Sequence, residues 1–598
     1  METNWNFRIV TAVCALIVGL SAAATAKIIY VDDDAAGANN GSSWANAFVH
    51  LQRALVVAKS GDEVRVAQGL YRPDQEAPKA SHRYVGIDPS GSPYASFRLM
   101  SGVVIMGGFA GIGAEDPNAR DAERYRTILS GDIHGNDVDG WDLGHPMYES
   151  LRKDNSSHVV ESSSANSTAV LDGFTIQAAA QSGMYNRNGS PRVVNCTFRQ
   201  NSSQTYGGGA LCCDGGQPSL SHCVFQGNAA MIVGGAIYAS GAHLTLSDCR
   251  FIDNWAVSLG GAICSVNSDL LLTACTFRQN AGRQGGAVYH QQGMLTLTDC
   301  GFEGNMALEQ AGAVNLTQQS AVSMTGCTFR KNWTPHLGGA IVNEGVPLLL
   351  ERCTFGGNRA LLGGAIHTHG PYPLNSNPQA AGTVMIHCIF TGNQASDTGG
   401  ALWGYRAGLT MSGCTFTDNW ARTAATLGRS VGQTQETILR VAMENCLVWD
   451  GDNSMLVSRS SAKPATPSPE AGVDIVIRYS DVQGGWPGEG NIDADPRFAS
   501  LGSWVDASNP KVSVKPDHPK ATWVDGDYHL KSQAGRWDPV ARVWVQDGIT
   551  SPCIDAGDPK SPVGDEPQPN GGRINMGAYG GTAEASKSYQ APEPPVRR

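Results

Sequence analysis

The sequence has few charged residues and no excess of basic ones. Lys and Arg number 43 and Asp and Glu number 54, so charged residues make up 16% of the 598 residues and the formal net charge is −11. A globular protein usually has roughly 25% charged residues. Nucleic-acid binding needs a basic face that releases phosphate counterions. The charge balance therefore argues against a nucleic-acid partner, and the 41% apolar content argues against disorder.

Long apolar runs are also scarce. The one clear run extends from Ile9 to Ser21 and is followed by Ala24-Thr25-Ala26, which resembles a small-residue cleavage site. A membrane anchor is the alternative, but a spanning helix needs roughly 20 apolar residues. We therefore predict a signal peptide over residues 1–26 and no transmembrane segment after its removal. The protein is expected in the secreted fraction or on the cell surface, including the outer membrane.

The most prominent features of the sequence are its high glycine content and a repeated motif. Glycine contributes 72 residues, and nine of the fifteen phenylalanines belong to the motif Cys-x-Phe-x-x-Asn. A second motif, Gly-Gly-Ala, follows most of these cysteines by ten to twelve residues. The first motif begins at Cys196, Cys223, Cys249, Cys275, Cys300, Cys327, Cys353, Cys388 and Cys414, and a degenerate copy begins at Cys446. Such recurrence indicates a repeat architecture.

A unit of about 26 residues is typical of either a leucine-rich repeat or one coil of a β-solenoid. The unit around Leu244 and Leu246 alternates apolar and polar residues, which indicates strand. The units lack a helical 3.6-residue period and the leucine-rich consensus. Each unit is therefore predicted to contain three short strands, which pair in parallel with the next coil about 4.8 Å away.

The motif positions predict columns of like residues along the solenoid. The residue after each Gly-Gly-Ala is apolar, as in Ile237 and Ile263, and predicts an inward aliphatic column beside a phenylalanine column. The asparagines, from Asn201 to Asn419, follow the Phe strand at a turn. We expect them to adopt a left-handed backbone conformation and to hydrogen-bond from coil to coil.

These motifs resemble those of right-handed parallel β-helix proteins with the pectin-lyase-like fold. Gly-Gly-Ala-Ile at 234–237 and Phe-x-x-Asn at 251–254 are similar to the repeat of chlamydial polymorphic outer membrane proteins. They are also similar to repeats of secreted β-helix proteins of planctomycetes. The specific motifs cover residues 196–449, and a weaker resemblance extends from residue 28 to residue 580. The resemblance implies an all-β solenoid exposed at the cell surface or secreted.

The ends of the chain differ from the repeats. Residues 44–59 have apolar residues on one helical face, Ser42 or Ser43 can cap this helix, and Gly61 can end it. We assign 27–150 to an N-terminal cap and first irregular coils, 151–498 to the β-helix, and 499–598 to a C-terminal cap and tail. A ten-residue insertion is predicted around 367–381.

Ten of the fifteen cysteines share one position of the repeat. Straight stacking of coils favours a column of buried thiols there, with disulfides or metal binding as the alternatives. Cys212, Cys213 and Cys264 lie elsewhere and are expected to be better placed for exposed chemistry.

Candidate ligand-binding residues follow from the alternation of strand residues. If the aliphatic column points inward, the next residue and the one two further on point outward. These outward positions include aromatic and imidazole rings, which suit sugar faces and partner surfaces alike. The alternative is scattered surface aromatics without a ligand. The candidates are Tyr238, Tyr289, His367, Trp403 and Tyr405.

The same outward face has no cluster of carboxylates with a Lys or Arg base, as a polysaccharide lyase needs. The richest acidic segment contains Asp132, Asp137 and Asp139, whose oxygens could hold Ca²⁺, although a solvated turn is the alternative. We therefore expect an exported, non-enzymatic repeat protein that requires no cofactor and binds glycans or protein partners. The alternative function is a polysaccharide lyase or glycoside hydrolase of the pectin-lyase-like fold.

Overall fold

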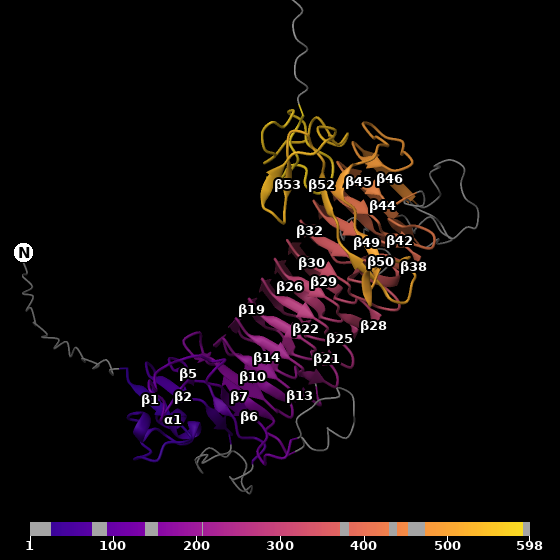
Figure 1. Cartoon of the computed structure of the whole chain (residues 1–598). Helices are drawn as coiled ribbons and strands as arrows, with labels where there is room; N and C mark the ends of the chain where they lie inside the picture. The colour runs from indigo at the N-terminus through magenta and orange to yellow at the C-terminus, as the bar shows by residue number, and fades with distance from the viewer. Residues whose placement is uncertain are drawn as a thin grey trace, which may run out of the picture.

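The computed structural model describes residues 26–73, 92–137, 154–205, 207–370, 382–429, 439–451 and 473–589. In this part of the chain, parallel strands stack into a long solenoid, with the N-terminal coils at one end and the C-terminal residues at the other (Figure 1). All but the last residue of the predicted signal peptide, and most of the predicted insertion after His367, lie outside the described residues. Within them, no helix is long and apolar enough to cross a bilayer.

Each regular coil contains four strands rather than the three expected. One coil consists of β18 (Ile237–Ser240), β19 (His243–Ser247), β20 (Arg250–Ile252) and β21 (Trp255–Ala256). The first two strands belong to the same 25-stranded sheet, because the chain bends only briefly between them. The Phe strands form a 14-stranded sheet, and the short fourth strands form sheets of five and three strands. The coil therefore still has three faces.

The other strands repeat this order. First strands are β10 (Ser182–Arg187), β14 (Leu211–Asp214), β22 (Ile263–Val266), β31 (Ile341–Glu344), β35 (Ile366–His369), β39 (Leu402–Tyr405) and β43 (Leu427–Arg429). Second strands are β11 (Arg192–Val194), β15 (Ser219–Ser221), β23 (Asp269–Thr273), β32 (Leu348–Glu351), β36 (Thr383–Ile386), β40 (Gly408–Ser412), β44 (Leu439–Glu444) and β46 (Val473–Arg478), and β26 (Val288–Thr298) and β29 (Val314–Thr325) join both.

Phe strands are β12 (Thr197–Arg199), β16 (Val224–Gln226), β24 (Thr276–Arg278), β27 (Gly301–Glu303), β30 (Thr328–Arg330), β33 (Thr354–Gly356), β37 (Ile389–Thr391), β41 (Thr415–Thr417), β45 (Leu447–Trp449) and β47 (Asp481–Val482). Fourth strands are β13 (Ser202–Ser203), β17 (Ala229–Ala230), β25 (Ala281–Gln284), β28 (Met306–Gln310), β34 (Arg359–Leu362), β38 (Gln394–Thr398) and β42 (Trp420–Ala421).

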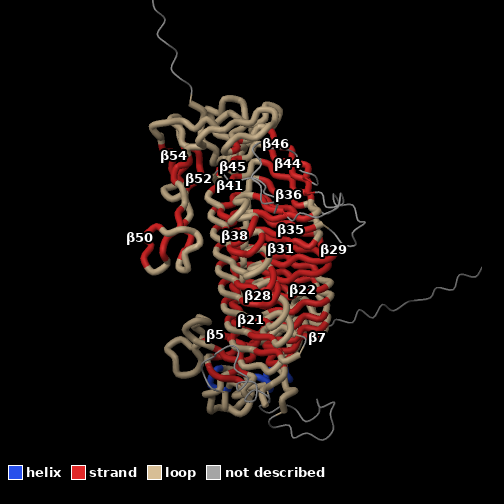
Figure 2. Tube along the Cα trace, turned by 90° about the vertical axis from the view of Figure 1, so that its right-hand side faces the viewer, coloured by secondary structure: helices blue, strands red, loops and turns tan. Residues whose placement is uncertain are grey.

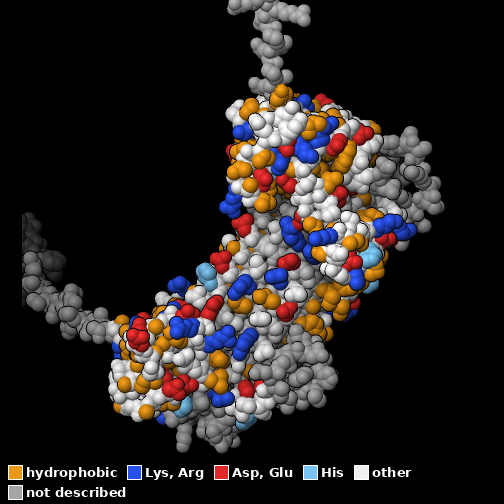
Figure 3. Space-filling model, in the orientation of Figure 1, with side chains coloured by type: hydrophobic (Ala, Val, Ile, Leu, Met, Phe, Trp, Pro, Cys, Tyr) orange, Lys and Arg blue, Asp and Glu red, His pale blue; other side chains and the backbone are white. Residues whose placement is uncertain are grey.

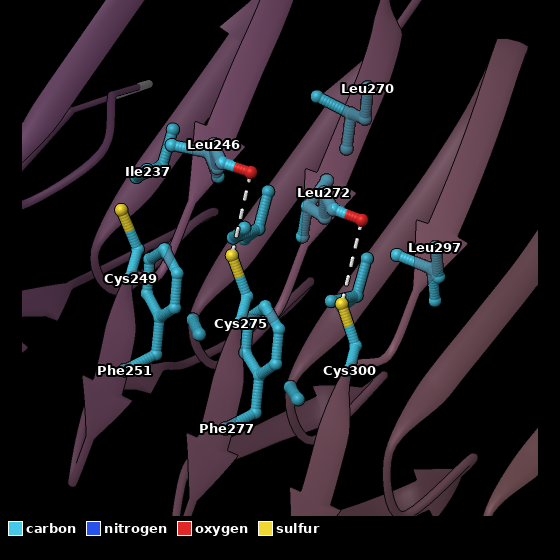
Figure 4. Packing of buried hydrophobic residues seen from close by; sticks show 14 of the residues in the cluster. Ile237, Leu246, Cys249, Phe251, Leu270, Leu272, Cys275, Phe277, Leu297 and Cys300 are labelled. Atoms are coloured by element: carbon cyan, nitrogen blue, oxygen red, sulfur yellow. Dashed lines mark hydrogen bonds between the residues drawn. The ribbon is translucent and has the colours of Figure 1, made fainter. Parts of the chain in front are cut away.

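The predicted columns form the core. The nine Phe rings of the motif stack nearly parallel, with neighbouring centroids such as those of Phe251 and Phe277 separated by 4.6 Å. The motif cysteines are buried and free, which confirms the predicted thiol column. Figure 4 shows how the Sγ of Cys275 donates to the Leu246 carbonyl at 3.7 Å. Burial raises the pKa of thiols such as that of Cys196.

The asparagine column bonds from coil to coil, as predicted. The Asn228 Oδ1 accepts from the backbone N and Nδ2 of Asn201, both at 3.1 Å. The Asn228 Nδ2 donates to the Phe198 carbonyl and to the Asn254 Oδ1, both at 3.0 Å. The left-handed conformation expected at the asparagines is wrong, because it falls on the preceding residue, as at Asp253 with φ 54°. The buried Asn is thereby oriented toward its neighbours.

The predicted N-terminal helix is divided into a 3₁₀ turn, η1 (Trp44–Asn46), and a helix, α1 (Leu51–Val57). The Ser43 hydroxyl accepts from the Asn46 backbone N at 3.3 Å, so Ser43 is the cap. The break occurs because Phe48 instead donates its backbone N–H to Tyr30, at 2.9 Å. The apolar face of α1 joins the main core and covers the end of the solenoid, seen in blue in Figure 2.

The first coils are less regular. Their strands are β1 (Ile28–Val31), β2 (Glu63–Ala67), β3 (Gly69–Tyr71), β4 (Phe97–Arg98), β5 (Val104–Phe109), β6 (Thr127–Ser130), β7 (His158–Ser163), β8 (Val170–Asp172) and β9 (Phe174–Gln177). They pair in parallel with the regular coils, so one continuous core extends from residue 29 to residue 482.

Residues 495–589, here called the C-terminal module, fold back along the outside of the Phe-strand sheet (Figures 1 and 2). The indole of Trp523 lies directly over Gly357 and Gly392, and Asp525 pairs with Arg330. The strands of the module pair antiparallel. They are β48 (Phe498–Ser500), β49 (Ser503–Asp506), β50 (Asn509–Ser513), β51 (Ala521–Val524), β52 (Asp527–Leu530), β53 (Arg536–Asp538) and β54 (Val543–Val545).

Candidate functional site

The predicted ligand-binding face is largely covered. The alternation itself is as predicted, because Leu402 lies in the main core and Trp403 lies outside it. However, the side chains of Tyr289, His367 and Trp403 are only 8%, 4% and 7% exposed. The prediction that these rings face solvent is therefore wrong. Among the candidates, Tyr238 and Tyr405 remain partly exposed.

The cover is the segment that returns from the fourth strand to the next Gly-Gly-Ala. Its residues Val233 and Leu259 pair in parallel between coils, and they pack on Tyr238, Cys264 and Tyr289. This contact makes a second, smaller apolar core outside the solenoid. The return segment has no repeated motif, so sequence periodicity did not show that it lies over the outward row.

Higher on the solenoid the same row forms a stack of rings. The His367 and Trp403 rings are stacked at 4.2 Å, and the centroids of Trp403 and Tyr405 are 6.4 Å apart. His369 lies 6.4 Å from His367. Burial lowers the pKa of His367 to about 3, so its imidazole is neutral. The structure thus brings three of the candidates together, apart from the pair Tyr238 and Tyr289.

The cysteines outside the ladder are also enclosed. Cys212 is 9% exposed, and Cys213 and Cys264 are fully buried. Burial raises the pKa of the Cys212 thiol to about 11, which suppresses its reactive thiolate form. The expectation that these thiols are suited to exposed chemistry is wrong.

The carboxylates of the predicted acidic segment accept hydrogen bonds within their own turn and from a neighbouring residue. The Asp132 Oδ1 accepts from the backbone N of Gly135 at 2.7 Å and of Asn136 at 3.1 Å. The Asp137 Oδ2 accepts from the Asn155 Nδ2 at 2.9 Å. Asp139 lies outside the described residues. These contacts match a stabilised turn and neither require nor exclude Ca²⁺.

Three other carboxylates gather in the N-terminal cap, at a place that sequence reasoning did not single out. Oxygens of Asp32, Asp33 and Asp34 lie within 4.8 Å of one another. The Asp32 Oδ2 accepts from the Ile112 backbone N at 2.6 Å, and the Asp33 Oδ2 accepts from that of Leu70 at 3.1 Å. Burial raises the pKa of both Asp32 and Asp33. The cluster could accept a hard cation, but the carboxylates of Asp32 and Asp33 already accept hydrogen bonds from the backbone.

A groove opens on another face, at the corner between the Phe strands and the fourth strands. We call it the Trp255 groove, and its volume is about 500 Å³. The Trp255 ring forms one part of its wall, and no atom lies within 4 Å of where a side chain would begin on Gly227. The groove is lined by Arg199, Gln200, Gln226, Gly227, Asp253, Asn254, Trp255, Gln279 and Ala281.

The repeat explains the shape of this groove. Gln200, Gly227 and Asp253 occupy the same left-handed turn position of successive coils, with φ between 53° and 59°. Only Gly227 lacks a side chain, so a gap opens between two polar neighbours. Trp255 follows Asn254, whose backbone N donates to the Asn280 Oδ1 at 3.0 Å and fixes the start of the fourth strand. The hydrogen bonds of the asparagine column thus fix the positions of both Gly227 and Trp255.

The sequence contains a signal for this site that the strand-based reasoning missed. The dipeptide Asn-Trp occurs at the end of the motif in three coils, giving Trp255, Trp333 and Trp420. Because the asparagines are in register, the following residues share one column on the surface. Trp333 is 41% exposed, in contrast to the buried Trp403 of the predicted face.

Three family models match parts of the chain. The right handed beta helix region matches residues 157–314, and the Chlamydia polymorphic membrane protein repeat matches residues 387–405. A family described as disaggregatase related matches residues 495–557, within the C-terminal module. No curated protein matches the sequence.

Solved structures with a similar chain course share little sequence with this protein. The catalytic unit of a GH87 alpha-1,3-glucanase from Streptomyces thermodiastaticus strain HF3-3 is 13% identical at a TM-score of 0.33, with 74% of this chain and 65% of the glucanase chain covered. Pectate lyase Pel9A is 12% identical at a TM-score of 0.26, with 93% and 96% covered. The stacked parallel coils and the matching family models show that the chain is a right-handed parallel β-helix with repeats like those of the chlamydial polymorphic membrane proteins.

Proposed function

We propose that this protein is an exported, non-enzymatic β-helix protein, secreted or held at the cell surface, that binds an uncharged polysaccharide in the Trp255 groove. The observation that carries the proposal is the combination of an indole wall, side-chain amides and an open floor at Gly227. Ligand sites commonly combine apolar or aromatic walls with a few placed polar groups. The groove has this composition.

The lining matches the chemistry of a sugar. An indole ring offers a flat apolar face to the C–H groups of a pyranose, as aromatic side chains do in amphipathic contacts. The amides of Gln226 and Gln279 can donate to and accept from hydroxyl groups. Arg199 and Asp253 contribute one charge of each sign, so the lining has no net charge for an acidic or basic ligand.

Binding is favoured over glycoside cleavage by the same lining. Most glycoside hydrolases use two carboxyl groups about 5 to 9.5 Å apart. Among the described residues that line the groove, Asp253 is the single carboxylate, and Arg199 is the one basic side chain. The Arg199 Nε donates to the Gln177 Oε1 at 2.8 Å, and an arginine without a second carboxylate does not make the acid–base pair of a hydrolase. Tyr238 and Tyr405 have the partial exposure that a contact needs and remain a secondary proposal. Binding of Ca²⁺ at the acidic segment that includes Asp132 is also a secondary proposal.

The test uses two substitutions in the groove and one outside it. Gly227→Gln fills the floor, and Trp255→Ala removes the ring. Gly241→Gln is the matched control, because Gly241 has a left-handed backbone like that of Gly227, with φ 61°, has no atom within 4 Å of its side-chain position, and is not among the residues that line the groove. The probes are immobilised neutral gluco-, xylo- and manno-oligosaccharides, followed by calorimetry with the disaccharide of any series that binds.

We expect the two groove variants to lose at least about tenfold in affinity for the disaccharide, the effect of losing a contact of about 1.4 kcal/mol. The Gly241→Gln protein should bind as the unmodified protein does. Failure of every neutral series to bind the unmodified protein would contradict the proposal. So would unchanged binding by both groove variants.

A further inference from the structure

An apolar strip continues upward from the Trp255 groove. It consists of Trp255, Ala281, Met306 and Trp333, which are paired in parallel from one coil to the next. Met306 is 36% exposed and Trp333 is 41% exposed. Figure 3 shows hydrophobic side chains gathered along the edge of the solenoid where β25 and β28 lie. The strip is thus a surface feature that connects two indole rings.

Two pairs of opposite charges lie beside the strip, whereas Lys331, two residues before Trp333, is exposed and has no ion pair within the described part of the chain. Arg283 pairs with Glu309 of the next coil at 2.7 Å, and Arg278 pairs with Glu303 at 3.1 Å. Further apolar side chains, Val257 and Leu308, widen the strip and are 39% and 56% exposed. Because these charges are paired, they offer little attraction to a strongly charged ligand. A neutral ligand with apolar faces therefore fits the strip best.

The upper end of the strip is closed by the C-terminal module. Directly above Trp333 in the same column lies Arg359. The Arg359 guanidinium lies 5.0 Å from the centre of the Trp504 ring and donates to the Ala521 carbonyl. A ligand on the strip is therefore blocked at its upper end.

We infer that the strip binds a linear, uncharged polysaccharide that runs parallel to the solenoid axis from Trp255 to Trp333 and ends against the C-terminal module. This inference rests on the proposed function and extends it to the form of the ligand. The coils repeat every 4.7–4.9 Å or so, which places the two rings about 14 Å apart. A single sugar covers one ring, whereas an extended chain contacts both and meets the flanking groups at regular intervals.

Dependence on ligand length tests the inference. Within a series that binds, calorimetry is performed from the disaccharide to the octasaccharide on the unmodified protein and on Trp333→Ala. Affinity for the unmodified protein should rise with length and then level off once the strip is filled. Trp333→Ala should lower affinity for the octasaccharide about tenfold and leave the disaccharide unchanged. Leu271→Ala, which removes a side chain 45% exposed in β23 on another face, is the matched control.

The possible outcomes separate this inference from the proposed function. If Trp255→Ala abolishes binding but affinity does not depend on length, the groove stands and the axial path is wrong. If Trp333→Ala affects the disaccharide as strongly as the octasaccharide, the axial path is also wrong. Light scattering supplies a further check. A dimer of the unmodified protein that Trp333→Ala dissociates would assign the strip to a second copy and overturn the inference.

Discussion

The outer corner of the solenoid that follows the Phe strands is open in the lower coils and covered by the C-terminal module in the upper coils. In the lower half, the turn positions hold polar side chains such as Gln200 and Asp253, and the surface is open. In the upper half, the equivalent positions hold Gly357 and Gly392, and the Trp523 ring lies directly on them. The backbone conformation is the same, with φ of 63° and 57° at these two glycines. A glycine where other coils carry side chains thus marks a place where something else can approach the backbone.

The largest expected effect is from Trp523→Ala. Trp523 is 3% exposed and packs between the module and the upper coils. Replacing a buried aromatic residue by alanine typically costs about 3–5 kcal/mol. We expect the C-terminal module to unfold or detach well below the melting temperature of the solenoid, as a separate transition in calorimetry. A single transition at the unmodified temperature would show that the ring does not hold the two parts together.

A smaller effect is expected from Gly392→Gln. A side chain on Gly392 would collide with the Trp523 ring, although the backbone there suits non-glycine residues, since Gln279 has φ 56° at the same position. Forcing extra atoms into a packed contact typically costs about 1–3 kcal/mol. Limited proteolysis should cleave the module faster than in the unmodified protein. Equal cleavage rates would mean that the module tolerates a shift away from the upper coils.

The upper half should also respond to pH. The buried Asp481 accepts a hydrogen bond from the Cys553 thiol of the module at 3.0 Å, and burial raises the pKa of Asp481 to about 6. Because this value lies above that of the unfolded chain, the folded state holds the proton more tightly between about pH 4 and pH 6. The contribution of Asp481 to stability is therefore greatest below about pH 4 and decreases as the pH rises to about 6.

Asp481→Asn tests this contribution, since the amide keeps an acceptor but cannot ionise. The melting temperature of the module, measured at pH 4.5 and pH 7.5, should differ less between the two conditions in the variant. The difference corresponds to roughly 1–3 kcal/mol, because each unit of pKa shift is worth about 1.4 kcal/mol. An unchanged pH dependence would assign the effect to other carboxyl groups, such as that of Asp418, whose pKa is also raised by burial, to about 6.

The comparison also shows which parts of the molecule sequence could predict. The Phe, Cys and aliphatic columns were predictable because each repeats at one position of every coil, so that a single unit implies the rest. The burial of Tyr289 was not, because its cover comes from a return segment without a motif. The docking of Trp523 on Gly392 was not predictable either, since it joins segments far apart in the chain that share no pattern. The Asn-Trp dipeptides did carry a signal, but they lie beyond the strands on which the prediction concentrated.

The smallest expected effect concerns the lower half, and it sharpens the comparison most directly. Gly227→Gln makes the same change as Gly392→Gln, at the same turn position, with φ 59° in place of 57°. No atom lies within 4 Å of the new side chain's first carbon, so no collision results. Surface changes of this kind usually alter stability by no more than about 0.5 kcal/mol. Equal melting temperatures for Gly227→Gln and the unmodified protein, beside a destabilised Gly392→Gln, would show that contact with the module, and not the backbone, requires glycine in the upper half. A comparable loss in both variants would instead place the requirement in the turn itself.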